Sequence, residues 1–492
     1  LYEEQGGNIM IRGGQLKILS RDDIYQIHYA TLEVLSTVGI FVQLDEAREI
    51  LKKAGADVDD KSKIVKFPEY LIKEQVKRAP SRFTVYARNK KHNVTIEDKK
   101  VVYEPMIGRL NIYDYEKKTV RRTNLEDVGN LIMVADAMEN YHMLHSGAIM
   151  PHIEGVPDYL AHVYGYFQSV KNSDKVIKGT CRGRLRAKDM LKMASIIAGG
   201  EEELRKKPMI FTTSNTISPL QLHADQLEGL IEFAKMRQPV DIASEPQAGA
   251  TAPATLAGLL VIQNAEVLAA ITIAQLISPG TPVFYGTVGT VMDMRTGYIS
   301  IGAIEIGIVN VASAQLARFY GLPSRGTACA TDSKILDMQA GYEKALTCLM
   351  AAMGGINMIF YPGTMELALT ISLESLVIDN EIIGMIYHAM KGIEVNEETL
   401  ALDIIRNVGP GGHFLAQRHT LEHVKKDHFI PKLGDRLRRE RWEQMGSKDI
   451  VERAHEVVKK IISEHEPEVP LEKDVEKELE NYTKEVKRRG YS

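Results

Sequence analysis

The chain has 492 residues, with 61 Lys and Arg against 65 Asp and Glu, and 44% of its residues are hydrophobic. This composition excludes a disordered or fibrous chain, and the length allows a large buried core. A net charge of -4 argues against nucleic acid as the main ligand, because nucleic-acid binding requires a basic face. The three cysteines, Cys181, Cys329 and Cys348, form no Cys-x-x-Cys pair, so neither a disulfide framework nor a structural zinc site is expected. Free thiols and the lack of a signal-like N-terminus predict a cytoplasmic protein.

The first hundred residues predict an α+β extension. Apolar residues recur at helical spacing over residues 21–36 and 44–54, and a third helix is predicted over 67–78, with Pro68 in its first turn. Residues 83–99 alternate as strands do, with polar turns between them. We expect this segment, residues 1–100, to pack outside the main body of the protein.

From residue 101 onward, a short apolar strand is followed by an amphipathic helix eight times in succession. Alternating units of this kind predict a parallel sheet, and eight of them close a (β/α)₈ TIM barrel of the α/β class. A Gly-x-Gly-x-x-Gly turn after the first strand, typical of a doubly wound sheet, is absent. We expect the barrel over 101–392 and a C-terminal helical extension over 393–492, with helices at 433–445, 448–463 and 473–490. The predicted strands are 101–106, 143–149, 175–180, 209–213, 239–244, 282–285, 323–327 and 356–361, and the helices are 125–138, 159–170, 187–198, 220–236, 254–277, 302–320, 339–353 and 373–390.

Residues 256–277 are apolar enough to require a membrane test. Glu266 lies in the middle of this stretch, and a carboxylate at mid-span is costly in lipid. The segment therefore predicts a helix buried inside a soluble protein, and no membrane partner is expected. This helix and residues 301–317 carry few charges for outer barrel helices, so we expect the terminal segments or a second subunit of a homo-oligomer to cover them.

The polar and aromatic residues that follow the strands are the candidate site, because barrel active sites lie at the carboxyl ends of the strands. Aromatic rings that converge there would form a cage for a quaternary ammonium, although each ring alone could be ordinary rim packing. Arginines there would bind a carboxylate, although each could equally be a solvated charge. The candidate residues are the aromatic Tyr103, Tyr285, Phe360 and Tyr361, the basic Arg109, Arg182 and Arg325, and the acidic Glu245, Asp332 and Glu366.

Two other chemistries remain open on the same residues. His145 and His152 lie seven residues apart and could bind a metal, but no third ligand has a defining spacing, and no metal site is expected. Lys178 lies late in a strand, where barrel aldolases carry a Schiff-base lysine. A metal- or lysine-dependent lyase therefore remains an alternative.

Several motifs resemble the trimethylamine methyltransferase family, and the likeness covers nearly the whole chain in order. The resemblance implies a barrel enzyme that moves a methyl group from an amine to the Co(I) of a corrinoid. That corrinoid is carried by a separate small protein, so no tightly bound cofactor is expected. The motifs are Gln263-Asn264-Ala265-Glu266-Val267-Leu268, Phe284-Tyr285-Gly286, Tyr320-Gly321-Leu322-Pro323-Ser324, Thr331-Asp332-Ser333-Lys334, Asp337-x-Gln339-Ala340-Gly341-x-Glu343-Lys344 and Leu376-Val377-Ile378-Asp379-Asn380.

The chain differs from the family's founding member at one informative position. The family's founding member carries pyrrolysine at the position that matches Ala330, and an alanine cannot bind or orient a methylamine. Members without pyrrolysine are similar to enzymes that demethylate glycine betaine and related quaternary amines. The sequence therefore predicts that activity. Trimethylamine demethylation and a non-catalytic sensor of quaternary amines are the remaining alternatives.

The chemistry of a quaternary amine needs little from the protein beyond positioning, because the leaving group is already a neutral amine. We expect the four aromatic candidates to surround the cation, with Ala330 on the pocket wall. Glu245, Asp332 and Glu366 would supply negative potential near it. If the substrate is a betaine, one of the three arginine candidates would hold its carboxylate.

Overall fold

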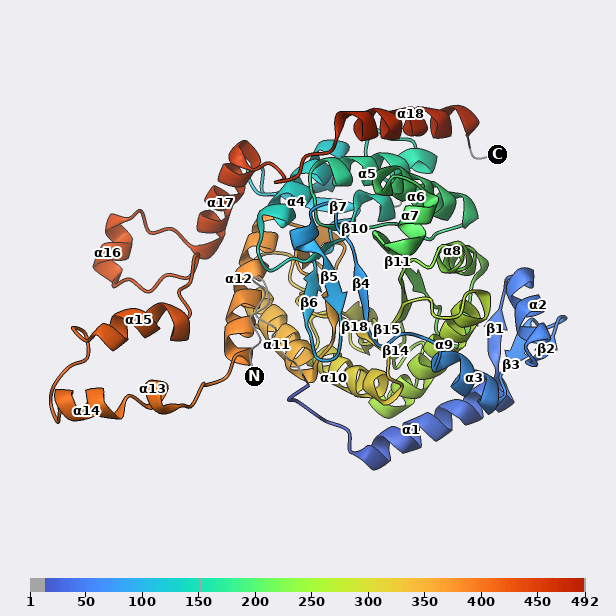
Figure 1. Cartoon of the computed structure of the whole chain (residues 1–492), viewed down its shortest axis with the longest axis horizontal. Helices are drawn as coiled ribbons and strands as arrows, with labels where there is room; N and C mark the ends of the chain where they lie inside the picture. The colour runs from blue at the N-terminus through green and yellow to red at the C-terminus, as the bar shows by residue number, and fades with distance from the viewer. Residues whose placement is uncertain (1–13, 151, 491–492) are drawn as a thin grey trace.

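The structure is a computed structural model that describes residues 14–150 and 152–490. Its centre is a sheet of eight strands in which every neighbouring pair is parallel (Figure 1). The order across the sheet is β6-β19-β18-β15-β13-β11-β10-β9. These strands are β6 (Val102–Glu104), β9 (Met143–Leu144), β10 (Val176–Lys178), β11 (Ile210–Asn215), β13 (Val240–Ser244), β15 (Val283–Thr287), β18 (Ser324–Thr327) and β19 (Met358–Phe360).

The two edge strands of this sheet also meet. The amide of His142, just before β9, donates to the carbonyl of Tyr103 in β6, with an N–O distance of 3.0 Å. The sheet therefore closes into the predicted barrel. The strand β9 is shorter than predicted because the Ser146 side chain accepts from the amide of Ala148 and begins a 3₁₀ turn there.

A helix follows each barrel strand, as the sequence predicted, and the (β/α)₈ fold is confirmed. The predicted limits of the N-terminal, barrel and C-terminal segments stay predictions. The eight helices surround the sheet in Figure 1. They are α4 (Leu125–Ala137), α5 (Ala161–Lys171), α6 (Arg184–Ala198), α8 (Ala224–Lys235), α9 (Leu256–Ile277), α10 (Ile304–Phe319), α11 (Met338–Gly354) and α12 (Leu373–Met390); a short α7 (Glu201–Lys206) follows α6.

The N-terminal segment covers the apolar helices. Helices α1 (Arg21–Glu33) and α3 (Glu69–Val76) lie along α9 (Figure 1), and Asn264 of α9 donates to the Thr31 hydroxyl at 2.9 Å. Gln315 of α10 accepts from the amides of Ile18 and Leu19. Of the 18 most apolar consecutive residues of α9, 72% are buried, so α9 packs as a core helix. The chain thus covers the surface that suggested a homo-oligomer, and the oligomer stays a prediction.

The rest of the N-terminal segment joins the barrel in two places. Strand β1 (Ile40–Val42) pairs with β3 (Ile64–Lys66) on one side and with β12 (Gln221–Leu222) of the barrel loops on the other; β2 (Asp57–Asp59) and α2 (Asp45–Lys53) complete this unit. The hairpin of β4 (Phe83–Val85) and β5 (Val94–Ile96) closes the amino end of the barrel. Phe83 packs edge-on against Phe284 inside it, with ring centroids 5.2 Å apart.

The C-terminal segment is helical, as predicted, but its first part is more broken than expected. Helices α13 to α16 extend away from the barrel in Figure 1, whereas α17 and α18 run back along it. Asp189 of α6 accepts from the Tyr482 hydroxyl of α18 at 2.7 Å. The helices are α13 (Glu397–Leu400), α14 (Leu402–Val408), α15 (Arg418–Asp427), α16 (Arg439–Gln444), α17 (Ile450–Glu464) and α18 (Lys473–Arg489).

Short strands in the loops at the carboxyl end of the barrel were not predicted. Each is two to four residues long, too short to show an alternating pattern. They are β7 (Asn111–Asp114) and β8 (Thr119–Arg122) after β6, β14 (Gln247–Ala248) after β13, β16 (Thr290–Asp293) and β17 (Tyr298–Ser300) after β15, and β20 (Thr364–Met365) and β21 (Thr370–Ile371) after β19.

Glu266 holds α9 to the barrel loops and gives a test of this packing. Its fully buried carboxylate accepts from the hydroxyls of Thr216, Ser218 and Ser244 and from the amide of Leu220, at 2.5–2.9 Å. The change Glu266→Ala leaves these donors unpaired, so we expect a loss of about 3–5 kcal/mol in urea unfolding. The exposed Glu202→Ala serves as the control, and equal midpoints for the two variants would contradict this packing.

Candidate active site

Charged side chains fill the carboxyl half of the barrel interior. Lys178 of β10 lies 3.1 Å from the carboxylate of Glu104 on β6, and both are almost fully buried. Arg325 of β18 lies 3.2 Å from Asp241 on β13, and this pair is equally buried. Each of the four comes from a different strand and lies on the side of its strand that faces the interior, because successive residues of a strand point to opposite faces. The barrel core here consists of two ion pairs rather than of apolar layers.

Phe360 of β19 contacts both cations. The Lys178 Nζ is 4.6 Å and the Arg325 Cζ 4.5 Å from its ring centroid. The centroid of the His145 ring is 5.1 Å from it. The ring of Phe360 therefore already contacts two cationic side chains of the protein, and this leaves little of its surface for a ligand cation.

Burial shifts the pKa values of the ionisable side chains in this interior. Burial raises the pKa of Glu104 to about 7, and the positive charge of Lys178 opposes that rise. Burial also lowers the pKa of Lys178, against the attraction of Glu104. Burial lowers the pKa of His145 well below its ordinary value, and its Nδ1 accepts from the amide of Gly108 at 2.9 Å. His145 is thus a neutral acceptor and not a proton carrier near pH 7.

A second layer lies nearer the open end. Arg109, in the loop after β6, places its Cζ 5.4 Å from the ring centroid of Tyr361. Glu245, directly after β13, accepts from the Asn215 amide at 2.7 Å. Glu245 is exposed to water, yet desolvation raises its pKa, and Arg325 and Arg109 oppose that rise. Glu245 is therefore in contact with water on one side and with the protein on the other.

Two polar atoms in this layer have no partner among the described residues. They are the Nε of Arg109, a donor, and the Oδ1 of Asn215, an acceptor. Burial lowers the pKa of Arg109, and the nearby Tyr361 and Glu245 oppose that change. A desolvated guanidinium with an unused donor is suited to an incoming carboxylate. Arg109 and Glu245 are near enough for each charge to oppose the pKa shift of the other, so they offer one positive and one negative group side by side.

Ala330 lies in an apolar cluster beside this layer, and its place on a pocket wall stays a prediction. Ala330 itself is fully buried. The cluster, which we call the mouth cluster, consists of Met106, Ala243, Val288, Ile301, Ile306, Ala330, Phe360, Tyr361 and Ala368.

The backbone is strained around the mouth cluster. Cys329 has a φ of 62° and Tyr361 a φ of 106°, and neither is a glycine. Glu366, Leu367 and Ala368 follow with φ values of 51–59°, which makes a left-handed turn. Such conformations cost roughly 1–3 kcal/mol per residue and gather at functional sites. Their position supports a site at this end of the barrel.

The remaining acidic candidates hold backbone rather than face the interior. The Asp332 carboxylate accepts from the amides of Ile301 and Gly302 at 2.7 and 3.1 Å, and from the Ser300 hydroxyl. Glu366 accepts from the Thr370 hydroxyl at 2.6 Å. Both carboxylates are therefore engaged by the loops around the site.

Three candidates lie away from the group and correct the expected site. Tyr103 packs edge-on against Tyr387 of α12, and the Tyr285 hydroxyl donates to Asn264 of α9 at 3.0 Å. Both tyrosines face the helices because they alternate with inward residues on their strands. Arg182 is exposed and lies 3.9 Å from Asp225. The aromatic cage therefore loses two of its four rings, and the carboxylate site loses one arginine.

The structure also separates the residues of the alternative chemistries. His152 is half-buried and contacts Asp158 at 2.7 Å, whereas His145 is fully buried in the barrel. Within residues 14–150 and 152–490, no three His, Cys, Asp or Glu side chains gather as metal ligands. Lys178 is buried and paired with Glu104 at 3.1 Å.

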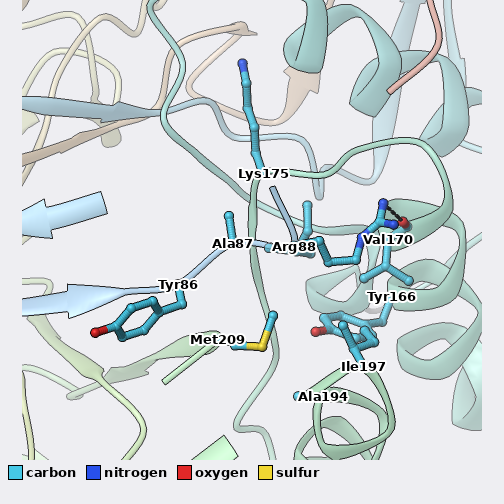
Figure 2. Close-up of a pocket in the computed structure, with 10 residues that line it drawn as sticks. Tyr86, Ala87, Arg88, Tyr166, Val170, Lys175, Ala194, Ile197 and Met209 are labelled. Atoms are coloured by element: carbon cyan, nitrogen blue, oxygen red, sulfur yellow. Dashed lines mark hydrogen bonds between the residues drawn. The ribbon is translucent and has the colours of Figure 1, made fainter. Parts of the chain in front are cut away.

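A cavity at the opposite, amino end of the barrel is too small for a substrate. Figure 2 shows Tyr86, Arg88, Tyr166, Lys175 and Met209 around it, and Arg88 donates to the carbonyl of Val170 at 2.9 Å. Only about 20 Å³ is open to the centre of a water molecule, which is room for about one. A larger opening of about 570 Å³ beside it has a wall of mixed charges, with Asp136 paired to His465 at 2.8 Å.

Comparison with known proteins places almost the whole chain in one protein family. Residues 3–490 match the sequence model of the trimethylamine methyltransferase (MTTB) family. The chain belongs to this family. It is 38% identical over 468 residues to glycine betaine methyltransferase of Desulfitobacterium hafniense (strain Y51), which is 94% of this chain and 96% of that protein. It is 36% identical to trimethylamine methyltransferase MttB of D. hafniense (strain DSM 10664 / DCB-2), covering 98% and 96%.

A solved structure supports the fold of this methyltransferase. The monomethylamine methyltransferase MtmB of Methanosarcina barkeri superposes with a TM-score of 0.50 at 14% identity, covering 92% of this chain and 96% of that one. At this identity the likeness concerns the fold alone.

Sequence reasoning missed part of the methyltransferase's interior. Asp241 was not singled out, although it interrupts an apolar strand, Val240 to Ser244, at an inward position. Glu104 and Asn215 followed strands but were not chosen as site residues. A charged residue inside a strand that is otherwise apolar was the signal that could have found the ion pairs.

The Glu104–Lys178 pair gives a test of the interior. In Lys178→Met the carboxylate is buried alone, so we expect a loss of about 3–5 kcal/mol in urea unfolding near pH 8. Glu104 already titrates near pH 7 in the fold, above its ordinary 4.5, so stability from this group falls as the pH rises through that window. Lys178→Met removes the charge that opposes the rise of this pKa, so the carboxyl of the variant takes up a proton already above pH 7, and the loss should shrink as the pH falls.

The double variant Glu104→Gln/Lys178→Met removes both charges and should recover most of that loss. The exposed pair Glu69 and Lys73 on α3 is the control, with Glu69→Gln/Lys73→Met expected to cost less than about 1 kcal/mol. A loss in Lys178→Met that is independent of pH, or that the double variant does not recover, would show that the two groups are not a buried pair.

Proposed function

We propose that this methyltransferase demethylates glycine betaine or a closely related betaine. The observation that carries the proposal is the juxtaposition of Arg109, with an unpartnered Nε, and the water-accessible Glu245 at the open end of the barrel. A betaine is a zwitterion that joins a carboxylate to a quaternary ammonium. The carboxylate end matches the guanidinium of Arg109, and the ammonium end matches the carboxylate of Glu245.

The wall of the site supports the same substrate. Ala330 leaves open the position where the resemblance places pyrrolysine, and the mouth cluster around it is apolar. An apolar wall suits the methyl groups of a quaternary ammonium, which offer no hydrogen bonds. The name of the glycine betaine methyltransferase relative points to the same class.

The proposed reaction needs positioning rather than acid–base help. The bond between nitrogen and one methyl carbon breaks, and both electrons of that bond stay on nitrogen, giving a neutral tertiary amine. The methyl carbon would pass to the acceptor, the Co(I) of a corrinoid that a cognate partner protein carries, which would supply both electrons of the new cobalt–carbon bond and so become Co(III). Glu245 must hold the cation weakly, because a strong grip on a charge that disappears would oppose the reaction.

The other parts of the proposal follow from this reaction. The chain itself would need no tightly bound cofactor, since the corrinoid comes with its protein. The enzyme would work in the cytoplasm, where a reducing environment suits both Co(I) and the three free cysteines. We retain a homo-oligomer as part of the proposal.

Arg109 provides the sharpest test. The change Arg109→Met should lower kcat/KM for glycine betaine roughly 10- to 100-fold, because a charge-assisted hydrogen bond to the carboxylate is lost. It should change little for choline, which has no carboxylate. The measurement is the anaerobic methylation of cob(I)alamin, followed by absorbance. Arg182→Met, on the exposed rim, is the matched control; equal effects of Arg109→Met on both substrates would contradict carboxylate binding.

Unlike a change at Arg109, a change at Glu245 should affect both substrates. Glu245→Gln keeps the contact with Asn215 but removes the negative charge, so binding of both betaine and choline should weaken by about tenfold. Calorimetric titration without any corrinoid measures this directly. If the unmodified enzyme binds betaine but never methylates cob(I)alamin, a sensor of quaternary amines is the better interpretation. If it acts on trimethylamine alone, the betaine assignment is wrong.

A further inference from the structure

A third buried ion pair lies outside the barrel interior, between α11 and α12. Lys344 Nζ and Asp379 Oδ2 are 2.7 Å apart, with exposures of 1% and 0%. The proposed reaction uses neither residue. A buried pair of this kind is a poor way to add stability, because apolar residues of similar volume are often as stable or more so. The contacts around the pair indicate another use.

Each member of the pair reaches one strained strand end. Lys344 Nζ also donates to the carbonyl of Cys329 at 3.2 Å, directly before Ala330. Asp379 Oδ2 also accepts from the amide of Gly363 at 2.6 Å, two residues after Tyr361. Cys329, Tyr361 and Gly363 all have positive φ. The ion pair thus joins the ends of β18 and β19 where both leave the regular strand conformation.

The neighbouring residue on α11 extends this frame. Glu343 Oε2 accepts from the amide of Asp332 at 2.8 Å and from the Thr331 hydroxyl at 2.5 Å. Asp332 in turn holds the amides of Ile301 and Gly302 in the loop after β17. The two loops also bond to each other, because the amide of Glu366 donates to the Ser333 carbonyl at 2.8 Å. Side chains of two outer helices therefore fix three loops around the mouth cluster.

We propose that Lys344 and Asp379 form a clamp that holds loops 328–333 and 361–368 in their strained conformation and so places Ala330 and Tyr361 at the open end. Both are positioning residues, since they act through the backbone and touch no substrate. The effect of the clamp on betaine rests on the proposed function. The effect on the two loops does not.

The test replaces both charges at once, with Lys344→Met/Asp379→Leu. Amide hydrogen exchange followed by mass spectrometry should show loops 328–333 and 361–368 exchanging at least about tenfold faster, with β10 and β11 unchanged. The KM for betaine should rise by about tenfold, and kcat should fall less, because the wall and ring around the substrate are displaced. Glu69→Gln/Lys73→Met, an exposed pair on α3, is the control and should change neither quantity.

A second variant keeps the proposal testable if the first does not fold. In Lys344→Met/Asp379→Asn the amide oxygen can still accept from the Gly363 amide, so only loop 328–333 should loosen. Unchanged exchange in the loops of a folded variant, or uniform acceleration over the whole barrel, would overturn the clamp. If the unmodified enzyme acts on no quaternary amine, the proposed function fails, but the exchange result still decides the clamp.

Discussion

The enclosure of four charges in the upper half of one barrel constrains the rest of the structure. Removing an ion from water costs several kcal/mol even in a real protein, so each charge needs a partner at close range. Glu104 pairs with Lys178, and Asp241 with Arg325. Both cations also face Phe360, which fixes that ring. Apolar residues and the β4–β5 hairpin fill the amino half, so the polar half is confined to the end where strand loops can build a site.

The sequence was sufficient for the architecture because the architecture depends on periodicity. Eight repeats of strand and helix leave a strong pattern, and each predicted helix is present. The direction of single side chains depends instead on the register, where one residue reverses inside and outside. Tyr103 and Tyr285 were chosen for their chemistry at strand ends, yet each alternates with an inward neighbour, Glu104 and Gly286, and faces a helix. Asp241, the second residue of its strand, faces the interior although the residues around it are apolar.

The loops of the site were beyond prediction for a different reason. Their conformation is imposed by distant contacts rather than by local preference. No glycine marks the left-handed turn at Glu366 to Ala368, so the sequence gives no sign of it. The turn persists because the amides of Glu366 and Leu367 donate to the carbonyls of Ser333 and Thr331 in another loop. Outer helices, which appear in the sequence as ordinary barrel elements, supply the remaining anchors.

The charges of the site bear on the choice among possible amines. Three cations, Arg109, Lys178 and Arg325, face three carboxylates, Glu104, Asp241 and Glu245, and four of the six form close pairs. A zwitterion adds no net charge to this balance and gives the Arg109 Nε an acceptor. A quaternary cation without a carboxylate leaves that donor unpaired, as it is in the free protein, and gains nothing from it. Discrimination then comes from a charge-assisted hydrogen bond that only a ligand with a carboxylate can make, worth about 1.5–3 kcal/mol. The buried pairs matter to this selection, because they leave Arg109 as the cation still available to a substrate.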